Sequence, residues 1–190
     1  IKFLNAWLKT IGFDIDKKKI EKLKKGNSYL SNVSLNTIKK NYKKNFFCTS
    51  DFKYVSKLDV IVLCLPTPLK KNFTPDLSYV KKTLKNIFPY LKNNQAISLE
   101  STTYPGTTEE IIQIALNKKF KIGENFNLIY SPERDDPGSN IKNFYVPRLI
   151  SGKTKNCLKI AKVLYGKIFK KLVSMDDMRT AEITKLFENI

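Results

Sequence analysis

Short apolar segments recur along the chain, each ending in polar residues, glycine or proline, and this pattern predicts β-strands. The clearest is Asp59–Leu65, whose apolar residues do not alternate with polar ones. Such a run is expected where both faces of a strand are covered, so we predict a central parallel strand here. Further strands are predicted at residues 9–14, 45–49, 95–99, 126–130, 148–151 and 171–174.

Helical periodicity separates these strands. Residues 76–91 place Leu77, Val80, Leu84, Ile87 and Leu91 on one face, with Asp76 in position to cap the helix. Strands that alternate with helices are typical of an α/β fold, so we predict a doubly wound parallel sheet. The other predicted helices cover residues 16–25, 36–44, 107–116 and 154–169, and a final helix begins at 179. Residues 1–8 are predicted to be the tail of a helix, and residues 50–56 a turn or short helix.

One strand-to-helix turn concentrates hydroxyl groups. Ser101, Thr102 and Thr103 follow the strand at residues 95–99, and Pro-Gly separates them from Thr107-Thr-Glu-Glu110. The Thr-x-x-Glu spacing predicts a capping box for the next helix. Ligands bind beyond the carboxyl ends of strands in open α/β sheets, so the hydroxyls are either part of a site or simple helix caps.

Two other strand ends carry candidate binding groups. Asp14 ends the strand at 9–14, where dinucleotide-binding folds place a carboxylate that accepts hydrogen bonds from ribose hydroxyls. Thr67 follows the strand at 59–65 inside Pro-Thr-Pro. The carboxyl ends of parallel strands meet at one edge, so Thr67 should lie near Ser101–Thr103.

Charge and composition narrow the chemistry. Lys and Arg total 35 against 17 Asp and Glu, which gives a formal net charge of +18. This charge leaves a basic nucleic-acid-associated protein as an alternative. However, arginine occurs only at positions 134, 148 and 179, whereas readers of nucleic acid usually use arginine for bidentate contacts. A lysine-biased composition is the simpler explanation, and we expect no nucleic-acid partner.

Several kinds of site are excluded. The chain has no histidine, and Cys48, Cys64 and Cys157 are too far apart for a zinc site, so we predict no metal. We expect these cysteines to be reduced and mostly buried.

The longest apolar run, Val60–Leu65, is far too short to span a membrane, and no signal-peptide pattern opens the chain, so we expect a cytoplasmic protein without a membrane partner.

Six motifs, in the same order, resemble the nucleotide-sugar 6-dehydrogenases of the UDP-glucose/GDP-mannose dehydrogenase family. The resemblance covers residue 10 to the end. The motifs are most similar to those of the UDP-N-acetylglucosamine 6-dehydrogenases. The motifs are Gly-Phe-Asp-Ile-Asp16, Leu-Pro-Thr-Pro-Leu69, Pro-Asp-Leu-Ser-Tyr-Val80, Glu-Ser-Thr-Thr-Tyr-Pro-Gly-Thr-Thr108, Ser-Pro-Glu-Arg134 with Asp-Pro-Gly138, and Ala-Glu-Ile-Thr-Lys-Leu-Phe-Glu-Asn189.

The resemblance implies a Rossmann-like NAD-binding domain and a set of roles. Asp14 would hold the adenosine ribose, with Lys19 near it. Thr67 and Thr102 would contact NAD, and Thr102 would also position the catalytic water. Glu133 would orient or activate that water. Lys185 and Asn189, one helical turn apart, would stabilise the oxyanion formed as the C6 alcohol of a UDP-sugar is oxidised to the uronate.

The sequence also departs from the family. Its seven glycines never approach Gly-x-Gly-x-x-Gly spacing, so the first strand and its phosphate-binding loop are missing from these residues. None of the cysteines matches the family's nucleophile motif. We therefore expect a fragment that is not a competent catalyst alone.

The expected organisation is an incomplete NAD-binding domain over residues 1–175, followed at 176–190 by the start of the central helical dimerisation region. Full-length relatives are expected to be homodimers that take part in surface polysaccharide biosynthesis. A relative of the NAD-dependent 3-hydroxyacid dehydrogenases is the other alternative, but Ser-Pro-Glu-Arg and Pro-Gly-Thr-Thr disfavour it.

Overall fold

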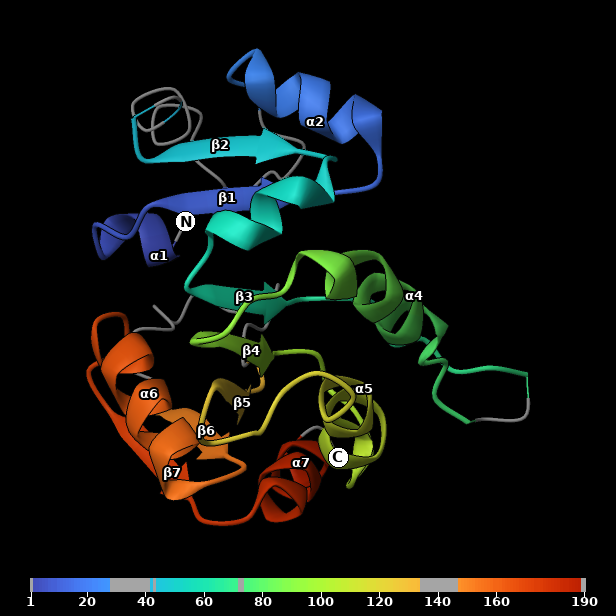
Figure 1. The fold of residues 1–190 in the computed structure, drawn as a ribbon, viewed down its shortest axis with the longest axis vertical. Coiled ribbons are helices and arrows are strands. Elements are labelled where there is room, and N and C mark those ends of the chain that lie inside the picture. Colours follow the sequence, from blue (N-terminus) through green and yellow to red (C-terminus); the bar gives the residue numbers. More distant parts are fainter. Residues whose placement is uncertain (1, 28–41, 43, 72–73, 134–146, 189–190) are drawn as a thin grey trace. The chain divides into compact units, whose positions relative to one another are not determined.

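A computed structural model describes residues 2–27, 42, 44–71, 74–133 and 147–188. The chain divides into two compact units, Ile1–Tyr54 and Val55–Ile190, whose elements are labelled in Figure 1. No helix in the described ranges is both long and apolar enough to cross a membrane.

The first unit is built around a two-stranded parallel sheet. Its strands are β1, Thr10–Phe13, and β2, Phe46–Thr49; its helices are α1, Lys2–Asn5, and α2, Lys17–Lys24. Asp16 caps α2 by accepting hydrogen bonds from the backbone N–H groups of Lys18 and Lys19. These elements agree with the predicted ones. The helix predicted at 36–44 falls almost entirely outside the described residues.

The second unit contains a five-stranded sheet in the order β3-β4-β5-β6-β7. β3, β4 and β5 are mutually parallel, as predicted. Every residue of β4 and β6 is buried, so these strands form the centre of the core. The strands are β3, Val60–Leu63; β4, Gln95–Leu99; β5, Phe126–Tyr130; β6, Arg148–Gly152; and β7, Leu172–Met175.

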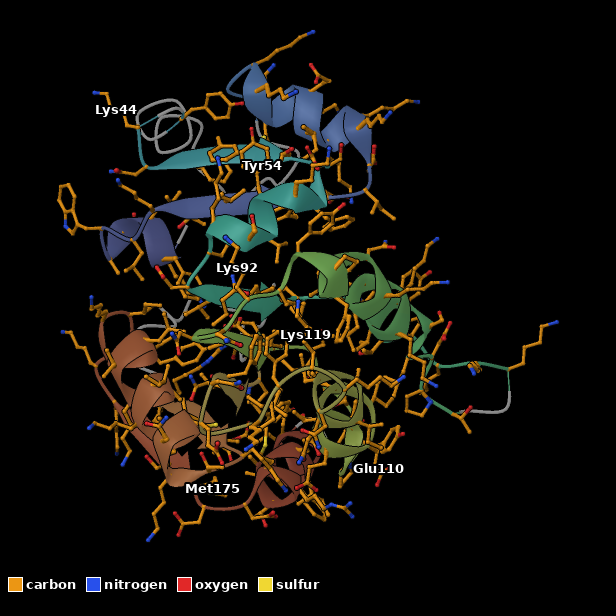
Figure 2. The ribbon with its side chains drawn as sticks, viewed as in Figure 1. Lys44, Tyr54, Lys92, Glu110, Lys119 and Met175 are labelled. Atoms are coloured by element: carbon orange, nitrogen blue, oxygen red, sulfur yellow. The ribbon has the colours of Figure 1, made fainter. Side chains whose placement is uncertain are left out.

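Helices follow most of these strands. The five apolar residues predicted to line one face of the helix after β3 are all buried, and the Asp76 carboxylate accepts from the backbone N–H of Ser78. Lys119, labelled in Figure 2, donates to the carbonyl of Leu91 and lies over the rings of Phe88 and Phe120. The helices are η1, Phe52–Lys57; α4, Ser78–Ile87; η2, Phe88–Tyr90; η3, Thr108–Gln113; α5, Ile114–Leu116; α6, Lys155–Gly166; and α7, Met178–Phe187.

The fold class is as predicted, but the direction of β6 departs from the expected parallel arrangement. β6 runs antiparallel to β5, with Ile129 opposite Gly152 and Tyr130 opposite Ser151, whereas β7 is parallel to β6. Continuing the β5–β6 register places Arg148 beside the residues that follow the carboxyl end of β5. A parallel strand would have carried Arg148 to the opposite edge of the sheet.

β3 lies at one end of this sheet and, in the described part of the second unit, pairs with β4 alone. With the first strand of the fold expected to be missing from these residues, this apolar run has a pairing neighbour on one side only. Ile61 and Leu63 are buried, but Val60 and Val62 are only half-buried. An uninterrupted apolar run therefore did not mean that both faces of this strand are covered.

Candidate functional site

The turns after β3 and β4 are joined at the carboxyl edge of the sheet. The Thr67 hydroxyl donates to the carbonyl of Thr102 at 2.8 Å. The Ser101 hydroxyl donates to the Leu65 carbonyl at 2.7 Å and accepts from the Leu65 N–H at 2.8 Å. Ser101 thus continues the pairing of the two strands, while Thr67 and Thr102 are brought together as the sequence predicted.

Glu133 is attached to the same edge through the segment after β5. The Ser131 N–H donates to the carbonyl of Leu99, and the Glu133 N–H donates to the carbonyl of Glu100, both at 3.0 Å. These bonds continue the β4–β5 ladder past the last strand residues. The backbone of the segment is therefore fixed, while the Glu133 side chain remains 37% exposed.

Arg148, the first residue of β6, holds the Glu133 carboxylate. Its guanidinium is only 1% exposed and contacts the Glu133 carboxylate at 3.1 Å and the Glu100 carboxylate at 3.0 Å. It also donates to the Ser131 hydroxyl at 2.7 Å and carbonyl at 2.9 Å. Burial acts to lower the pKa of Arg148, but Glu100, Tyr165 and Glu133 together raise it, so the guanidinium stays charged.

The aromatic rings of Tyr165, on α6, and Phe169, just after it, pack against Arg148. The Arg148 guanidinium carbon lies 5.2 Å from the centre of the Tyr165 ring and 5.0 Å from that of Phe169. The Tyr165 hydroxyl donates to Glu100 at 2.7 Å, and burial, followed by Glu100, raises the pKa of Tyr165 well above its ordinary value. The phenol therefore stays protonated and remains a donor to Glu100.

The close packing that brings Tyr165 here depends on Gly152. A Cβ added at Gly152 would lie 2.3 Å from the backbone nitrogen of Leu158, so only glycine lets α6 approach β6 this closely.

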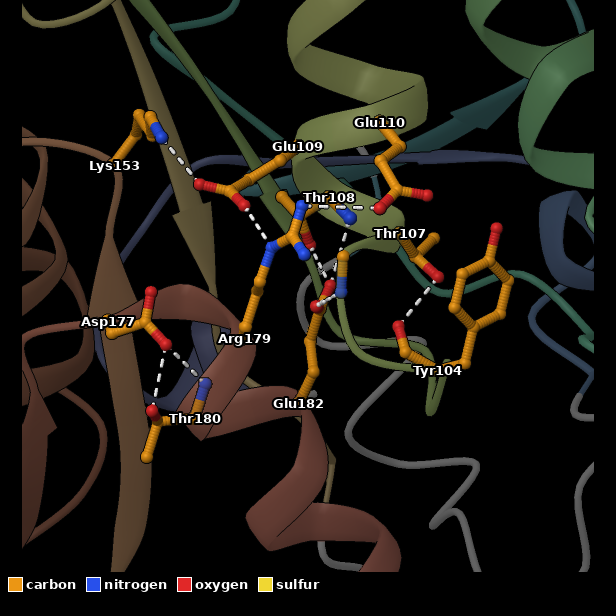
Figure 3. A network of polar contacts seen from close by, with 11 residues as sticks. Tyr104, Thr107, Thr108, Glu109, Glu110, Lys153, Asp177, Arg179, Thr180 and Glu182 are labelled. Atoms are coloured by element: carbon orange, nitrogen blue, oxygen red, sulfur yellow. Dashed lines mark hydrogen bonds and ion pairs between the residues drawn. The ribbon is translucent and has the colours of Figure 1, made fainter.

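The N-terminal end of η3 is not the capping box that the sequence predicted. The Thr107 hydroxyl donates back to the carbonyl of Tyr104 at 2.8 Å, and the Glu110 carboxylate pairs with Arg179 at 3.2 Å. Glu182 of α7 instead accepts from the N–H of Thr108, the first residue of η3, and from the N–H of Gly106 just before the helix (Figure 3). A carboxylate distant in sequence has replaced the local cap.

The predicted residues of α7 fall partly within the described region. Lys185 lies on α7 and is only 8% exposed, which is unusual for a lysine and sets it apart from an ordinary solvated one. Asn189 lies outside the described residues, so its predicted role stays a prediction.

Asp14 and Lys19 lie close together in the first unit. Their charged groups are 3.6 Å apart, and the other Asp14 oxygen accepts from the backbone N–H of Asp16 at 2.9 Å. The Asp14 side chain is 27% exposed, so its carboxylate is positioned and still accessible. A partly exposed carboxylate after β1 fits the hydrogen-bonding needs of a ribose diol.

The cysteines divide into two classes. Cys48 and Cys157 are buried, as expected, whereas Cys64 is exposed and its thiol faces Glu100 at 3.7 Å. Burial of the sulfur and, next, the charge of Glu100 raise the pKa of Cys64 to about 12. A thiol held in its protonated form is a poor nucleophile.

Comparison with known proteins identifies the family. The model of the UDP-glucose/GDP-mannose dehydrogenase family, NAD binding domain, matches residues 3–169. The chain belongs to this family. Its fold is accordingly that of the family's NAD-binding domain, and NAD is the cofactor that this domain binds.

Individual relatives agree with this assignment. The chain is 32% identical to a UDP-N-acetyl-D-mannosamine dehydrogenase of Methanocaldococcus jannaschii, over 94% of the chain and 42% of that protein. It is 30% identical to a UDP-N-acetyl-D-glucosamine 6-dehydrogenase of Pseudomonas aeruginosa, over 94% of the chain and 43% of that protein. The chain thus spans less than half the length of these curated relatives.

A solved structure supports the same fold. The structure of a UDP-D-ManNAc dehydrogenase from Pyrococcus horikoshii is similar with a TM-score of 0.91 and 26% identity, covering 99% of this chain and 46% of that one. These comparisons do not favour the nucleic-acid-associated alternative.

Two residues of the site were not predicted from the sequence. Arg148 could have been noticed because it is one of three arginines among 35 basic residues. Glu182 stands inside the Ala-Glu-Ile-Thr-Lys motif, but nothing local indicates that its carboxylate binds a turn 74 to 76 residues away.

Proposed function

We propose that this chain supplies NAD-binding and catalytic groups to a dehydrogenase that oxidises the C6 alcohol of a UDP-N-acetylhexosamine to the uronate. The observation that carries the proposal is the carboxyl edge of the second unit, where the Thr67–Thr102 contact and the Arg148-bound Glu133 follow three adjacent parallel strands. This is the edge at which doubly wound sheets bind their ligands.

The cofactor-binding roles follow from the accessible polar groups. Asp14 would accept hydrogen bonds from the adenosine ribose, with Lys19 keeping its carboxylate in place. Thr67 and Thr102 would line the part of NAD that approaches the substrate. When bound, NAD⁺ supplies the hydride acceptor for the oxidation.

The catalytic roles use the charged residues of the edge and of α7. Lys185 would stabilise the negative charge that develops on the C6 oxygen, with Asn189 as a second donor. Glu133 would orient and deprotonate the water that releases the product, and Thr102 would help to place that water. We assign no nucleophilic role to Cys48, Cys64 or Cys157.

The substrate class rests on the relatives. Their names specify UDP-N-acetyl-D-mannosamine and UDP-N-acetyl-D-glucosamine, and we propose these two UDP-sugars as the candidate substrates of this protein. UDP-glucose, which has no N-acetyl group, is the third candidate. We also propose a cytoplasmic enzyme of surface polysaccharide biosynthesis, homodimeric at full length, whose NAD-binding domain covers residues 1–175 and whose central helical region begins at 176.

Ligand binding by the chain as it stands tests the proposal. In an NMR titration with NAD⁺, we expect weak binding that shifts the backbone signals of Asp14, Thr67 and Thr102. D14N and T67V should weaken it, whereas S78A, on α4, should not. The absence of saturable shifts, or equal shifts with inorganic diphosphate, would contradict the proposal.

Turnover is a separate measurement. These 190 residues contain no Gly-x-Gly-x-x-Gly loop, so we expect no NADH when the chain is mixed with NAD⁺ and each of the three UDP-sugars. Formation of NADH would overturn the prediction that the chain is inactive alone.

A further inference from the structure

Glu182 lies on α7, one helical turn before Lys185, and is fully buried. One of its carboxylate oxygens accepts from the Gly106 N–H at 2.5 Å, and the other accepts from the Thr108 N–H at 2.9 Å and the Thr108 hydroxyl at 2.5 Å. All three donors belong to the Pro-Gly-Thr-Thr turn that follows Thr102. Figure 3 shows the carboxylate beneath this turn.

The contact joins two segments whose proposed roles require a fixed separation. Thr102 lies four residues before Gly106, and Lys185 lies three residues after Glu182. Residues three apart on a helix share a face, so anchoring Glu182 also fixes the direction of Lys185. Lys185 is itself buried, which agrees with a helix docked along this face.

We propose that Glu182 is a positioning residue that docks α7 on the Pro-Gly-Thr-Thr turn and thereby sets where the Lys185 amine lies relative to Thr102. The oxyanion role of Lys185 rests on the function proposed above, but the docking does not. The proposal gives a physical reason why the Pro-Gly-Thr-Thr and Ala-Glu-Ile-Thr-Lys motifs occur together in this chain.

Neighbouring charges could in principle dock the helix without Glu182. Arg179 donates to Glu109 at 2.7 Å and contacts Glu110 at 3.2 Å, and Lys153 pairs with Glu109 (Figure 3). However, the Arg179 side chain is 53% exposed, and exposed ion pairs contribute little to stability. The Glu182 carboxylate is buried and its hydrogen bonds are charge-assisted, so each contributes more to stability.

The chemistry of a carboxylate fits this position better than that of an amide. Three donors converge on two oxygens, and glutamine would offer one oxygen and turn an N–H₂ group toward a backbone N–H. Aspartate would keep the charge but is one methylene shorter. E182Q and E182D therefore impair the contact for different reasons, one through donor mismatch and one through reach.

Lysine labelling measures the docking without substrate or nucleotide. The intact chain is acetylated under native conditions, and the modification of Lys185 is followed by mass spectrometry against that of Lys162, an exposed lysine on α6. Hydrogen bonds to charged groups are stronger than those between neutral groups. We therefore expect Lys185 in E182Q and E182D to react roughly tenfold faster or more, with Lys162 unchanged.

R179Q is the matched control, because it removes both ion pairs of Arg179 and leaves the Glu182 bonds intact. We expect R179Q to change the labelling of Lys185 by less than about twofold. Equal effects of R179Q and E182Q, or unchanged labelling of Lys185 in E182Q, would overturn the proposal.

A milder variant decides the matter if E182Q does not fold. T108V removes only the hydroxyl bond and keeps both backbone bonds, so labelling of Lys185 should rise by a smaller factor than in E182D. No rise in a folded T108V would count against the proposal. Failure to bind NAD⁺ would overturn the proposed function and leave this result unaffected.

Discussion

Arg148 and Arg179 each bridge two carboxylates, in a chain whose other basic residues are almost all lysines. A guanidinium presents several donors in a fixed plane and can serve two acceptors at once, whereas an ammonium behaves as a point charge. Arginine therefore stands at these positions for its geometry. The two sites differ mainly in burial, and this difference can be measured.

R148Q should destabilise the protein strongly. It leaves the carboxylates of Glu100 and Glu133 close together without their cation, and breaking a buried ion pair costs about 3–5 kcal/mol. Urea unfolding measures the change. R179Q, which also removes a two-carboxylate contact but at an exposed site, should shift the midpoint little. Similar losses in both variants would show that burial is not the deciding factor.

Cys64 should resist alkylation even though it is exposed. Burial of the sulfur, followed by Glu100, raises the pKa of Cys64 to about 12, so very little thiolate exists at pH 8. With iodoacetamide at pH 8, we expect Cys64 in the folded chain to react much more slowly than in the urea-unfolded chain. Equal rates for the two forms, read from the Cys64 peptide, would contradict this expectation.

The residues of the site could be predicted only where the signal is local. Thr67 and Thr102 follow apolar strands, and that position alone brings them to one edge. Arg148 and Glu182 act through partners far away in the sequence, at Glu100 and at Gly106 and Thr108. Which donor meets a buried carboxylate depends on the tertiary fold, and no short pattern encodes it.

At the scale of elements, apolar periodicity predicted nearly every helix and strand of the described residues but not how β6 is directed. Direction depends on the path of the chain between β5 and β6, and an apolar segment such as Arg148–Gly152 reads the same either way. This direction matters for the site, because it places Arg148 beside Glu133. The capping box failed for a similar reason, since Glu182 supplies a stronger cap than Thr107.

G106A should weaken the docking of η3 and α7. Gly106 has φ of +99°, and a Cβ there would lie 2.5 Å from the Glu110 carboxylate. A non-glycine residue in this region costs on the order of 1–3 kcal/mol. Urea unfolding gives the loss in stability, and the labelling of Lys185 shows whether the docking is loosened. A stable G106A with unchanged labelling would mean that the turn tolerates another conformation.

The buried Glu182 should also give the protein a pH-dependent stability. Burial raises the pKa of Glu182 above its ordinary value of 4.5, so the folded state holds its proton more tightly than the unfolded state. The associated stability is fully present below the unfolded pKa and is lost as pH rises through the folded one. E182Q should lack this decline. The measurement is the difference between the unfolding midpoints of the wild type and E182Q. We expect this difference to change from pH 4 to pH 7, as the wild type loses stability.

At the scale of the molecule, the two compact units differ in how much core they contain. Among the described residues of the first unit, the buried apolar side chains are Leu4, Ile20 and Cys48, whereas the second unit buries most of β4, β5 and β6. A two-stranded sheet on its own is marginally stable, because it buries little apolar area against the entropy of ordering its chain. The second unit should therefore be the more stable one.

Hydrogen exchange tests this difference and connects it to function. We expect the amides of β1 and β2 to exchange much faster than those of β4 and β5, because local opening costs least where the core is smallest. If NAD⁺ binds through Asp14 as proposed, it should slow exchange in β1 and β2 as its concentration rises, because it binds the folded form of this unit and not the unfolded form. D14N should lose this protection of β1 and β2, while exchange of β4 in the absence of NAD⁺ should be the same as in the wild type. Equal protection of both sheets without ligand would refute the first expectation. Protection of β1 and β2 by NAD⁺ in D14N would show that Asp14 does not make the ribose contact.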